Sequence, residues 1–576
     1  MLSAVPLERA VERIAAHMNA STGSIVVLDR QPGRTISAQY HAFLRGTGRG
    51  ILVSDPAGDD ETLSAVGRLT GIPSSSLGFD LQNATMLLSF GAPMFDGWGN
   101  PGTMNALHSA RTFTVTQIDP RYSRTARQSD QWIAIAPGTE RLAALSLASI
   151  LLEERTIRER MRTSIKDHEQ FTALTRDFTP EMTAGTTGIT PETLRTLAQQ
   201  LTRAAAPIVL CGADPGGGPM DAETEKVIAV LNILLGSVGR RGGIMVREYL
   251  PGMESVEHTR LQEIPDGSVG TLFIDGADSG YAIPWILIRK KLSTDASLVV
   301  SFSSVLDPLT AEADILIPAP APFEVLRDVH VTSHSAVPSF ALSVPILPLN
   351  ENAVETQTVL RMLAEKTGNG TEIPENEASL KAAVQRIHDS KRGSVQSPAD
   401  GAVTPVKEFS SSDDLWNALA SGGLWTGEEK KQNRLHPVTV AAVRPDKQQQ
   451  HDGLVMIASG YHGALHAAQL SPVMSKMFQE TDLRPVNNTI LLSPVTAQQV
   501  GIQHDGQAVI TTTAGTQQVR TKISPAVRPG VLEASIGPSP NGTETPGHPS
   551  APSLLRLFPV SADGYWRTTT VTLQKV

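Results

Sequence analysis

Along most of the chain, short apolar runs alternate with stretches whose apolar residues recur every three or four positions. Runs of the first kind have the length of buried strands, and stretches of the second kind have the spacing of one helix face. The apolar runs lie at 24–28, 86–91, 113–118, 208–212, 271–276 and 297–302, and the clearest helical stretches lie at 5–18 and 141–152. This alternation predicts an α/β fold with doubly wound parallel sheets.

The pattern changes after about residue 395. Residues 396–450 are rich in Gln, Ser, Lys and Asp, which predicts a linker or a surface excursion. From about residue 452, short runs with alternating or continuous apolar residues follow at regular spacing, separated by Gly501, Gly506 and Gly515. Such spacing predicts a small C-terminal β-barrel.

A signature that occurs twice relates two parts of the α/β region. The first copy contains Asp119-Pro120, Thr125-Ala126 and Asp130, and a looser second copy contains Asp307-Pro308, Thr310-Ala311 and Asp314. In each copy an apolar run leads into an Asp-Pro turn, as where a strand ends at the edge of a parallel sheet. Nucleotide-like ligands bind at such edges, so we expect two pseudo-related lobes with one or two ligands between them.

The chain has 576 residues, more than one core usually supports, so we expect three or four lobes. The composition shifts divide it into five segments. They are 1–75, the first part of one α/β lobe; 76–250, a second lobe of dinucleotide-binding type; 251–395, the continuation of the first lobe; 396–450, the linker; and 451–576, the barrel domain.

Charge and cysteine content narrow the function classes. A net charge of −9 argues against non-specific nucleic-acid binding. No stretch approaches 18 consecutive apolar residues, so no transmembrane segment is expected. The N-terminal residues lack the basic and apolar regions of a signal peptide, which taken alone indicates the cytoplasm. The one cysteine, Cys211, excludes an internal disulfide and an iron–sulfur cluster held by cysteines of this sequence.

Eight segments resemble a known family, and they occur in the family's order. They are 6–15, 80–92, 118–126, 137–140, 231–243, 273–284, 310–318 and 492–531. By these segments the chain is identified as a member of the molybdopterin oxidoreductases of the dimethyl sulfoxide reductase and formate dehydrogenase type. The resemblance covers nearly the whole chain. It implies that the α/β lobes meet the pterin cofactor and that the barrel caps it.

The resemblance also implies a set of cofactor-binding residues. They are Gly91, Asp119, Arg121, Thr125, Glu140, Gly276, Asp307 and Asp314. Asp119 would accept the ribose hydroxyls of a guanosine, although a strand that simply ends at an Asp-Pro turn explains this residue equally well. Glu140 stands where the family commonly has an aspartate that binds guanine, and its longer side chain puts that contact in doubt.

Two departures from the family concern the metal. Members usually begin with a domain that holds a four-cysteine cluster, and this sequence has no counterpart of it. The metal ligand is normally Cys, selenocysteine, Ser or Asp, and the corresponding stretch, 50–60, has no cysteine. Asp55, Asp59 or Asp60 could approach a metal as hard carboxylate ligands. The alternative is that Asp59 and Asp60 cap a helix that begins at Glu61.

These features leave hypotheses of different classes. In the first, the chain is a subunit without its own metal site, with a degenerate active site and no iron–sulfur cluster or other cofactor. It would resemble the molybdopterin-binding-like subunits of the menaquinone reductase complex and of alternative complex III. In these complexes electrons move between quinone and cytochrome c through heme and iron–sulfur partners. In the second, it is an active molybdenum or tungsten bis-pterin oxidoreductase that binds molybdopterin guanine dinucleotide, with the cluster on another chain. A third is a binding module that keeps a guanine dinucleotide for structure only.

The first hypothesis implies partners and a location. The expected partners are an iron–sulfur subunit, a multiheme cytochrome c and an integral membrane subunit that interacts with quinone. The expected location is the periplasmic side of the cytoplasmic membrane, where the chain would be peripheral. Relatives of this kind reach the periplasm by a twin-arginine signal that this sequence does not show. A truncated sequence, export with a partner and a cytoplasmic location all stay open.

Overall fold

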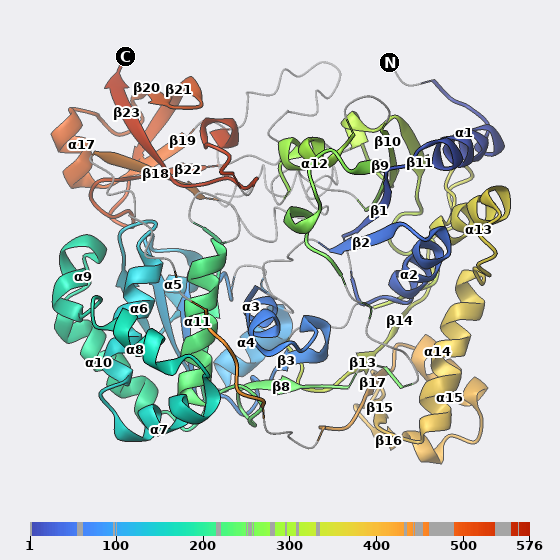
Figure 1. The fold of residues 1–576 in the computed structure, drawn as a ribbon, viewed down its shortest axis with the longest axis horizontal. Helices are drawn as coiled ribbons and strands as arrows, with labels where there is room; N and C mark the ends of the chain where they lie inside the picture. Colours follow the sequence, from blue (N-terminus) through green and yellow to red (C-terminus); the bar gives the residue numbers. More distant parts are fainter. Residues whose placement is uncertain are drawn as a thin grey trace. The chain divides into compact units, whose positions relative to one another are not determined.

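The structure is a computed structural model that consists of two compact units (Figure 1). It describes residues 3–30, 32–54, 61–95, 98, 101–214, 220–248, 250–251, 256, 258–276, 283–293, 297–306, 310–329, 334–430, 435–441, 443, 453–459, 489–535, 554–562 and 564–576. The first unit comprises 1–55, 247–331 and 337–430, and the second comprises 56–246, 332–336 and 431–576. Each unit is described by itself below.

The first unit is built on a parallel sheet with the strand order β11-β10-β9-β1-β2. Its strands are β1 (Ser24–Asp29), β2 (Gly50–Ser54), β9 (Val269–Asp275), β10 (Leu298–Ser303) and β11 (Ile315–Pro318). Strand β2 lies on one side of β1 and β9 lies on the other, so the winding reverses between β1 and β9. Ligands of doubly wound sheets bind at the carboxyl ends of the strands that flank such a switch point.

Helices with one apolar side cover this sheet. They are α1 (Leu7–Ala20), α2 (Thr35–Thr47), α12 (Trp285–Lys291) and α13 (Thr356–Thr367). Helix α1 has the predicted periodicity, because its buried residues are Ala10, Val11, Ile14, Ala15 and Met18. They join β-strand residues such as Val27 and Phe273 in one core.

A smaller part of the first unit has a core of its own. It contains α14 (Asn376–Ser390), α15 (Ser412–Ala420), the pair β12 (Arg327–Asp328) and β14 (Leu342–Ser343), and a sheet of β13 (Ser339–Phe340), β17 (Leu424–Thr426), β15 (Ser394–Gln396) and β16 (Val403–Pro405). The stretch 396–450 therefore differs from the expected linker in its described part. Trp425, only 1% exposed, packs with Leu415 and Leu419 in this core. Its few apolar residues are widely spaced, and the polar composition between them concealed these elements.

The second unit contains a four-stranded parallel sheet with the order β6-β5-β4-β7. Its strands are β4 (Met86–Phe90), β5 (Thr114–Asp119), β6 (Gln131–Ala134) and β7 (Pro207–Cys211). Here β4 is flanked by β5 and β7, so the switch point lies between β4 and β7. A separate antiparallel pair joins β3 (Leu77–Phe79) and β8 (Ile244–Val246).

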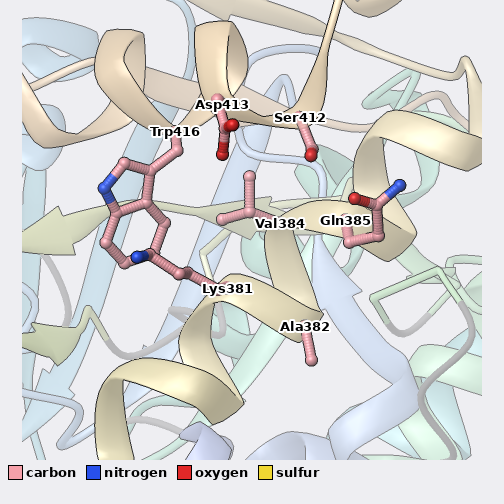
Figure 2. Close-up of a pocket in the computed structure, with 7 residues that line it drawn as sticks. All are labelled: Lys381, Ala382, Val384, Gln385, Ser412, Asp413 and Trp416. Atoms are coloured by element: carbon pink, nitrogen blue, oxygen red, sulfur yellow. The ribbon is translucent and has the colours of Figure 1, made fainter.

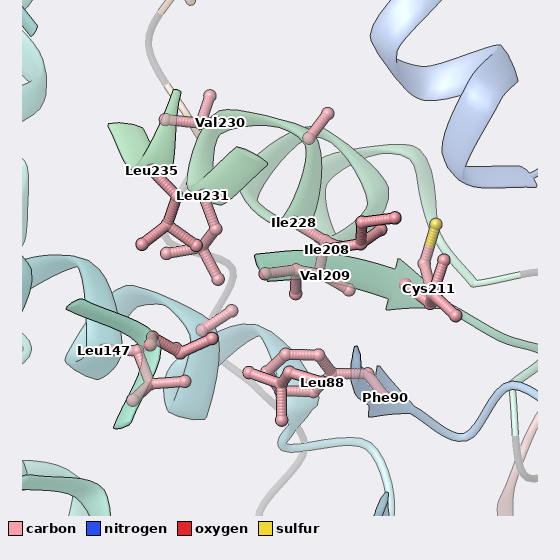
Figure 3. Close-up of a cluster of buried hydrophobic side chains, with 14 of the residues drawn as sticks. Leu88, Phe90, Leu147, Ile208, Val209, Cys211, Ile228, Val230, Leu231 and Leu235 are labelled. Atoms are coloured by element: carbon pink, nitrogen blue, oxygen red, sulfur yellow. The ribbon is translucent and has the colours of Figure 1, made fainter. Parts of the chain in front are cut away.

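Helices pack around this sheet. They are α3 (Glu61–Thr70), α4 (Pro101–Ser109), α5 (Arg124–Gln128), α6 (Glu140–Leu151), α7 (Arg155–Ser164), α8 (His168–Thr175), α9 (Pro180–Thr187), α10 (Pro191–Arg203) and α11 (Ala222–Leu235). Figure 3 shows side chains of α11, among them Ile228 and Leu231, over Val209 of β7. The buried amide of Asn232 covers the edge of β7, because it accepts from Val209 N (2.9 Å) and donates to Val209 O (2.7 Å).

The second unit also contains a closed six-stranded barrel in the order β18-β22-β19-β21-β20-β23. Its elements are β18 (Leu454–Ser459), β19 (Thr489–Leu492), α17 (Pro494–Val500), β20 (Gln507–Thr512), β21 (Gly515–Ile523), β22 (Val531–Ser535) and β23 (Thr569–Lys575). Short 3-10 turns occur at Ser74–Ser76, Leu261–Glu263, Thr310–Glu312, Val406–Glu408 and Leu554–Leu557. Parallel α/β sheets in two units and a C-terminal barrel confirm the predicted fold. In the described ranges, no helix has both the length and the apolar character needed to cross a bilayer.

Candidate functional site

Glycine borders the switch point of the second unit. Gly91 directly follows β4 and has a positive φ of 74°, and Gly212 directly follows β7. A Cβ built on Gly212 would lie 2.3 Å from the carbonyl carbon of Gly91. The two strand ends therefore approach each other so closely that a side chain at Gly212 would clash. Glycine at these two positions leaves this part of the carboxyl edge without side chains, as at the phosphate-binding turns of dinucleotide folds.

Asp119 is the last residue of β5, and it is 6% exposed. Its carboxylate accepts hydrogen bonds from Arg121 N (3.1 Å) and Gln117 Nε2 (3.3 Å). Burial raises the pKa of this carboxyl above its ordinary value, against the lowering effect of the Arg121 charge. The bond from Arg121 N is that of an Asp-Pro turn, and a role toward ribose stays a prediction.

Arg121 and Thr125 support the loops around this edge. The Arg121 guanidinium lies 3.4 Å from Glu533 Oε1 of the barrel strand β22. Thr125, on the short helix α5, is 1% exposed, and its hydroxyl accepts from Phe95 N (3.2 Å) in the segment after β4. Arg121 thus links the loop after β5 to the barrel, and Thr125 links α5 to the segment after β4.

Glu140 is the first residue of α6 and is 6% exposed. Its Oε1 atom has no hydrogen-bond partner among the described residues. Burial raises the pKa of this carboxyl from 4.5 to about 8, and repulsion from Asp214, Asp119 and Asp221 adds to the shift. A buried acid that has one oxygen without a partner among the described residues, close to other acids, is a candidate for ligand binding.

Two of the neighbouring acids have basic partners. Asp221, the N-cap of α11, pairs with Arg141 (2.7 Å). Asp214 follows β7 and lies 3.7 Å from a guanidinium nitrogen of Arg567, while its Oδ1 accepts from Thr568 N (3.2 Å). Asp221 and Asp214 therefore each have an arginine as a partner. In this group of acids, the oxygen that lacks a hydrogen-bond partner among the described residues is Oε1 of Glu140. The sequence pattern gave no sign of Asp214 or Asp221, since both lie outside the repeated signature.

The two remaining predicted residues that the structure describes in the first unit, Gly276 and Asp314, lie at opposite edges of its sheet. Gly276 follows β9 with a φ of 103°, and a Cβ built there would lie 3.4 Å from Arg30 Cβ. Asp314 precedes β11, and its carboxylate accepts from Val299 N near the start of β10 (2.9 Å). It therefore lies at the amino-terminal edge of the sheet, away from the switch point. Asp307, Asp55, Asp59 and Asp60 lie outside the described residues.

The acids of the repeated signature have a shared structural role. In the second unit, Asp130 precedes β6 and accepts from Val115 N near the start of β5 (2.8 Å). Asp314 makes the equivalent bond to Val299 N. Each carboxylate thus ties the start of one strand to the start of its neighbour.

Charged residues that the sequence analysis did not select meet at the switch point of the first unit. Arg34 lies 2.7 Å from Asp275 Oδ2 and 3.7 Å from Asp29 Oδ1. Both aspartates end apolar runs, as Asp119 does, and this shared pattern was the signal that could have revealed them.

A pocket of about 290 Å³ occurs elsewhere in the first unit (Figure 2). It lies between α14 and the start of α15, and the Lys381 ammonium lies 5.6 Å from the ring centroid of Trp416. None of the predicted site residues lines it. Among the described residues, no group of three or more His, Cys, Asp and Glu side chains is arranged to hold a metal ion.

Comparisons with known proteins agree with this architecture. The family model of the molydopterin dinucleotide binding domain matches residues 469–547. A menaquinone reductase, molybdopterin-binding-like subunit of Nitratidesulfovibrio vulgaris is 28% identical over 371 residues, which are 60% of this chain and 52% of that protein. The chain thus matches about half the length of this relative.

Other relatives are similar over more of the chain. The thiosulfate reductase molybdopterin-containing subunit of Salmonella typhimurium is 22% identical over 615 residues, covering 92% of this chain and 78% of that protein. Acetylene hydratase from Pelobacter acetylenicus has the same fold, with a TM-score of 0.72 at 14% identity over 100% of this chain and 90% of that structure.

Dinucleotide-type sheets together with a closed barrel define the fold, which the chain shares with acetylene hydratase. In sequence and in fold the chain is similar to molybdopterin oxidoreductases. This confirms the resemblance seen in the sequence.

Proposed function

We propose that this chain is a molybdopterin-oxidoreductase-like subunit of a respiratory electron-transfer complex of the quinone and cytochrome c type. The observation that carries the proposal is the similarity to a menaquinone reductase subunit over 60% of the chain. Its partners would be an iron–sulfur subunit, a multiheme cytochrome c and an integral membrane subunit, on the periplasmic side of the membrane. In this role the chain has no metal centre of its own and retains a site for a guanine dinucleotide in the second unit.

The second unit fits the guanine part of such a cofactor. Guanine carries neighbouring N–H donors, and a carboxylate is their natural acceptor. Glu140 offers a buried carboxyl whose Oε1 has no partner among the described residues. Gly91 and Gly212 leave backbone at the switch point, where the nucleotide would pass. These residues would hold the guanine nucleotide of the cofactor, and redox chemistry would come from its pterin part when a metal is bound.

The raised pKa of Glu140 implies a proton movement on binding. With a pKa of about 8, the unliganded carboxyl carries its proton at neutral pH. Donors from guanine favour the ionised form, so binding would release this proton to solvent. Against the raising effect of burial, Arg141 lowers the pKa of Asp221 and keeps that carboxylate charged. The site then gains one negative charge on Glu140, which the N–H donors of the bound base stabilise.

The test is isolation of the tagged chain in mild detergent from membranes of its own host. We expect a heme-containing chain and an integral membrane chain to co-purify, and the isolated complex to transfer electrons from a quinol to cytochrome c or back. Deleting the chain should abolish this transfer, whereas Glu192→Gln on the exposed face of α10 should not. A chain that purifies alone and reduces or oxidises a substrate by itself would contradict the proposal.

A second candidate is an active molybdenum or tungsten enzyme. Two observations favour it: the match to the dinucleotide-binding domain, and the Oε1 atom of Glu140, which has no hydrogen-bond partner among the described residues. Metal analysis by mass spectrometry separates the two, because this enzyme needs about one metal and two pterins per chain. A structural subunit would contain no stoichiometric molybdenum or tungsten.

A further inference from the structure

We infer that the switch-point crevice of the first unit is closed by the protein's own charged side chains, so that the chain binds one dinucleotide, in the second unit, rather than two. The inference that one dinucleotide binds rests on the proposed function, which assigns the guanine site to Glu140 in the second unit. The closure of the first unit rests on separate contacts, described below.

An arginine fills the crevice between the two strands that flank the switch point. Strands β1 and β9 end at Asp29 and Asp275, which are register partners in the sheet. The Arg34 guanidinium lies between them, 2.7 Å from Asp275 Oδ2 and 3.7 Å from Asp29 Oδ1. Its side chain is 12% exposed, and that of Asp29 is fully buried. At the corresponding register positions the second unit has the uncharged residues Phe90 and Cys211, and glycine follows each of them.

The buried Asp29 has further partners within the first unit. Its Oδ2 accepts from Ser37 Oγ (2.6 Å) and lies 3.6 Å from His258 Nε2. Arg30 covers the neighbouring Gly276, since a Cβ on that glycine would lie 3.4 Å from Arg30 Cβ. A nucleotide that entered here would have to separate a buried ion pair, which leaves buried charges without compensation.

The anion position of this sheet is also occupied. Phosphates of dinucleotides bind the free N–H groups at the start of the helix that follows the first strand. In the first unit that helix is α2, and Thr35 N and Thr35 Oγ1 both donate to Asp328 Oδ2, at 2.5 Å and 2.6 Å. Asp328 comes from β12, about 290 residues further along the chain. A phosphate would have to displace this carboxylate and approach Asp29 and Asp275 as well, which is unfavourable for an anion.

The experiment counts guanine nucleotide in the isolated complex. Acid hydrolysis releases guanosine monophosphate from pterin guanine dinucleotides, and chromatography measures it against the chain concentration. We expect one per chain in the wild type and in Arg34→Lys, which keeps the charge between the aspartates. We expect at least a tenfold loss in Glu140→Ala, whose folding is checked by its melting temperature and by co-purification of the partners.

Other outcomes have distinct meanings. Two nucleotides per chain would overturn the closure of the first unit while leaving the proposed function intact. One nucleotide that survives Glu140→Ala but is lost in Arg34→Lys would place it in the first unit and overturn the inference. No nucleotide in a wild-type complex that still contains its partners would overturn the count of one and the nucleotide part of the proposed function together.

Discussion

At the scale of single residues, Glu140 is the carboxylic acid of the second unit whose pKa the fold raises most clearly. It is an acid at the first position of a helix, where its own backbone N–H favours the charged form. Burial and three nearby aspartates outweigh that effect and raise the pKa to about 8. The folded, unliganded protein therefore keeps a proton that the unfolded chain loses above about pH 4.5.

This difference predicts a pH-dependent stability. Because the folded state binds more protons, stability should fall by up to about 1.4 kcal/mol for each pH unit between pH 4.5 and 8. Glu140→Gln removes the titrating group, so the unliganded variant should be more stable than wild type at pH 8 and little different at pH 4.5. Urea denaturation at both pH values measures this. The same change at exposed Glu192 is the control, and equal effects at the two sites would contradict the argument.

The same group predicts how nucleotide affinity depends on pH. Guanine donors need the ionised carboxylate, so affinity for guanosine diphosphate, used as a probe, should rise about tenfold per pH unit below pH 8 and level off above it. Calorimetric titration of the unliganded protein measures the dissociation constant. Glu140→Asp should keep the pH-dependent binding, and Glu140→Ala should lose it. A flat profile in the wild type would mean that this carboxyl does not contact the base.

At the scale of elements, polar side chains tie helices and strands to one another. Asn232 of α11 completes the edge of β7 through two bonds to Val209. Asn232→Leu keeps the volume but leaves a buried N–H and C=O unsatisfied, so we expect a loss of about 2–4 kcal/mol in the free energy of unfolding. Asn417→Leu, on the exposed side of α15, should change it by less than about 0.5 kcal/mol. A similar small effect at Asn232 would show that water replaces these bonds.

The repeated signature makes a second prediction about elements. Asp130 and Asp314 each accept the amide of a neighbouring strand, at Val115 and Val299. Replacing either acid by Ala should lower stability by about 1 kcal/mol, and replacement by Asn, which keeps an acceptor, by less. Neither change should alter the guanine nucleotide content. A loss of nucleotide in Asp314→Ala at unchanged stability would restore the cofactor role that the resemblance implied.

At the scale of the whole molecule, two sheets with the same kind of winding end differently. Both place the first strand between its successor and a later strand, and both therefore have a switch point. In the second unit the two strands beside the switch point end at Phe90 and Cys211, each followed by glycine. In the first unit they end at Asp29 and Asp275, with Arg34 between them. A shared topology thus does not guarantee a shared ligand, because function depends on the side chains placed at the site.

The closed crevice predicts a large stability effect. Arg34→Met leaves Asp29 and Asp275 without their shared counter-charge, so we expect a loss of about 3–5 kcal/mol. Arg361→Met removes a more exposed pair with Glu375 and should cost less than about 1 kcal/mol. Denaturation curves of both variants at pH 7.5 compare them, and equal losses would show that Arg34 makes no special contribution.

Local order along the chain determined a large part of the structure. The spacing of apolar residues predicted the parallel sheets, helix α1 and the C-terminal barrel, because such periodicity reflects the face that each element buries. It did not indicate the helix and strands within 396–450, where a few apolar residues, such as Trp425, join a core that α14 also builds. In the first copy of the repeated signature Asp119 ends a strand, and in both copies the later acid, Asp130 or Asp314, precedes one. The Asp-Pro pair of the second copy lies outside the described residues.

Only the tertiary structure decided which polar groups meet. Arg34 and Asp275 are 241 positions apart, and Thr35 and Asp328 are 293 apart, yet each pair lies within hydrogen-bond distance. Asp314, in contrast, shares the signature but lies at the opposite edge of its sheet from the switch point. Periodicity specifies which face of an element is buried, whereas the order and direction of strands specify which of their ends come together. That order arises from packing between distant segments, and a local pattern does not contain it.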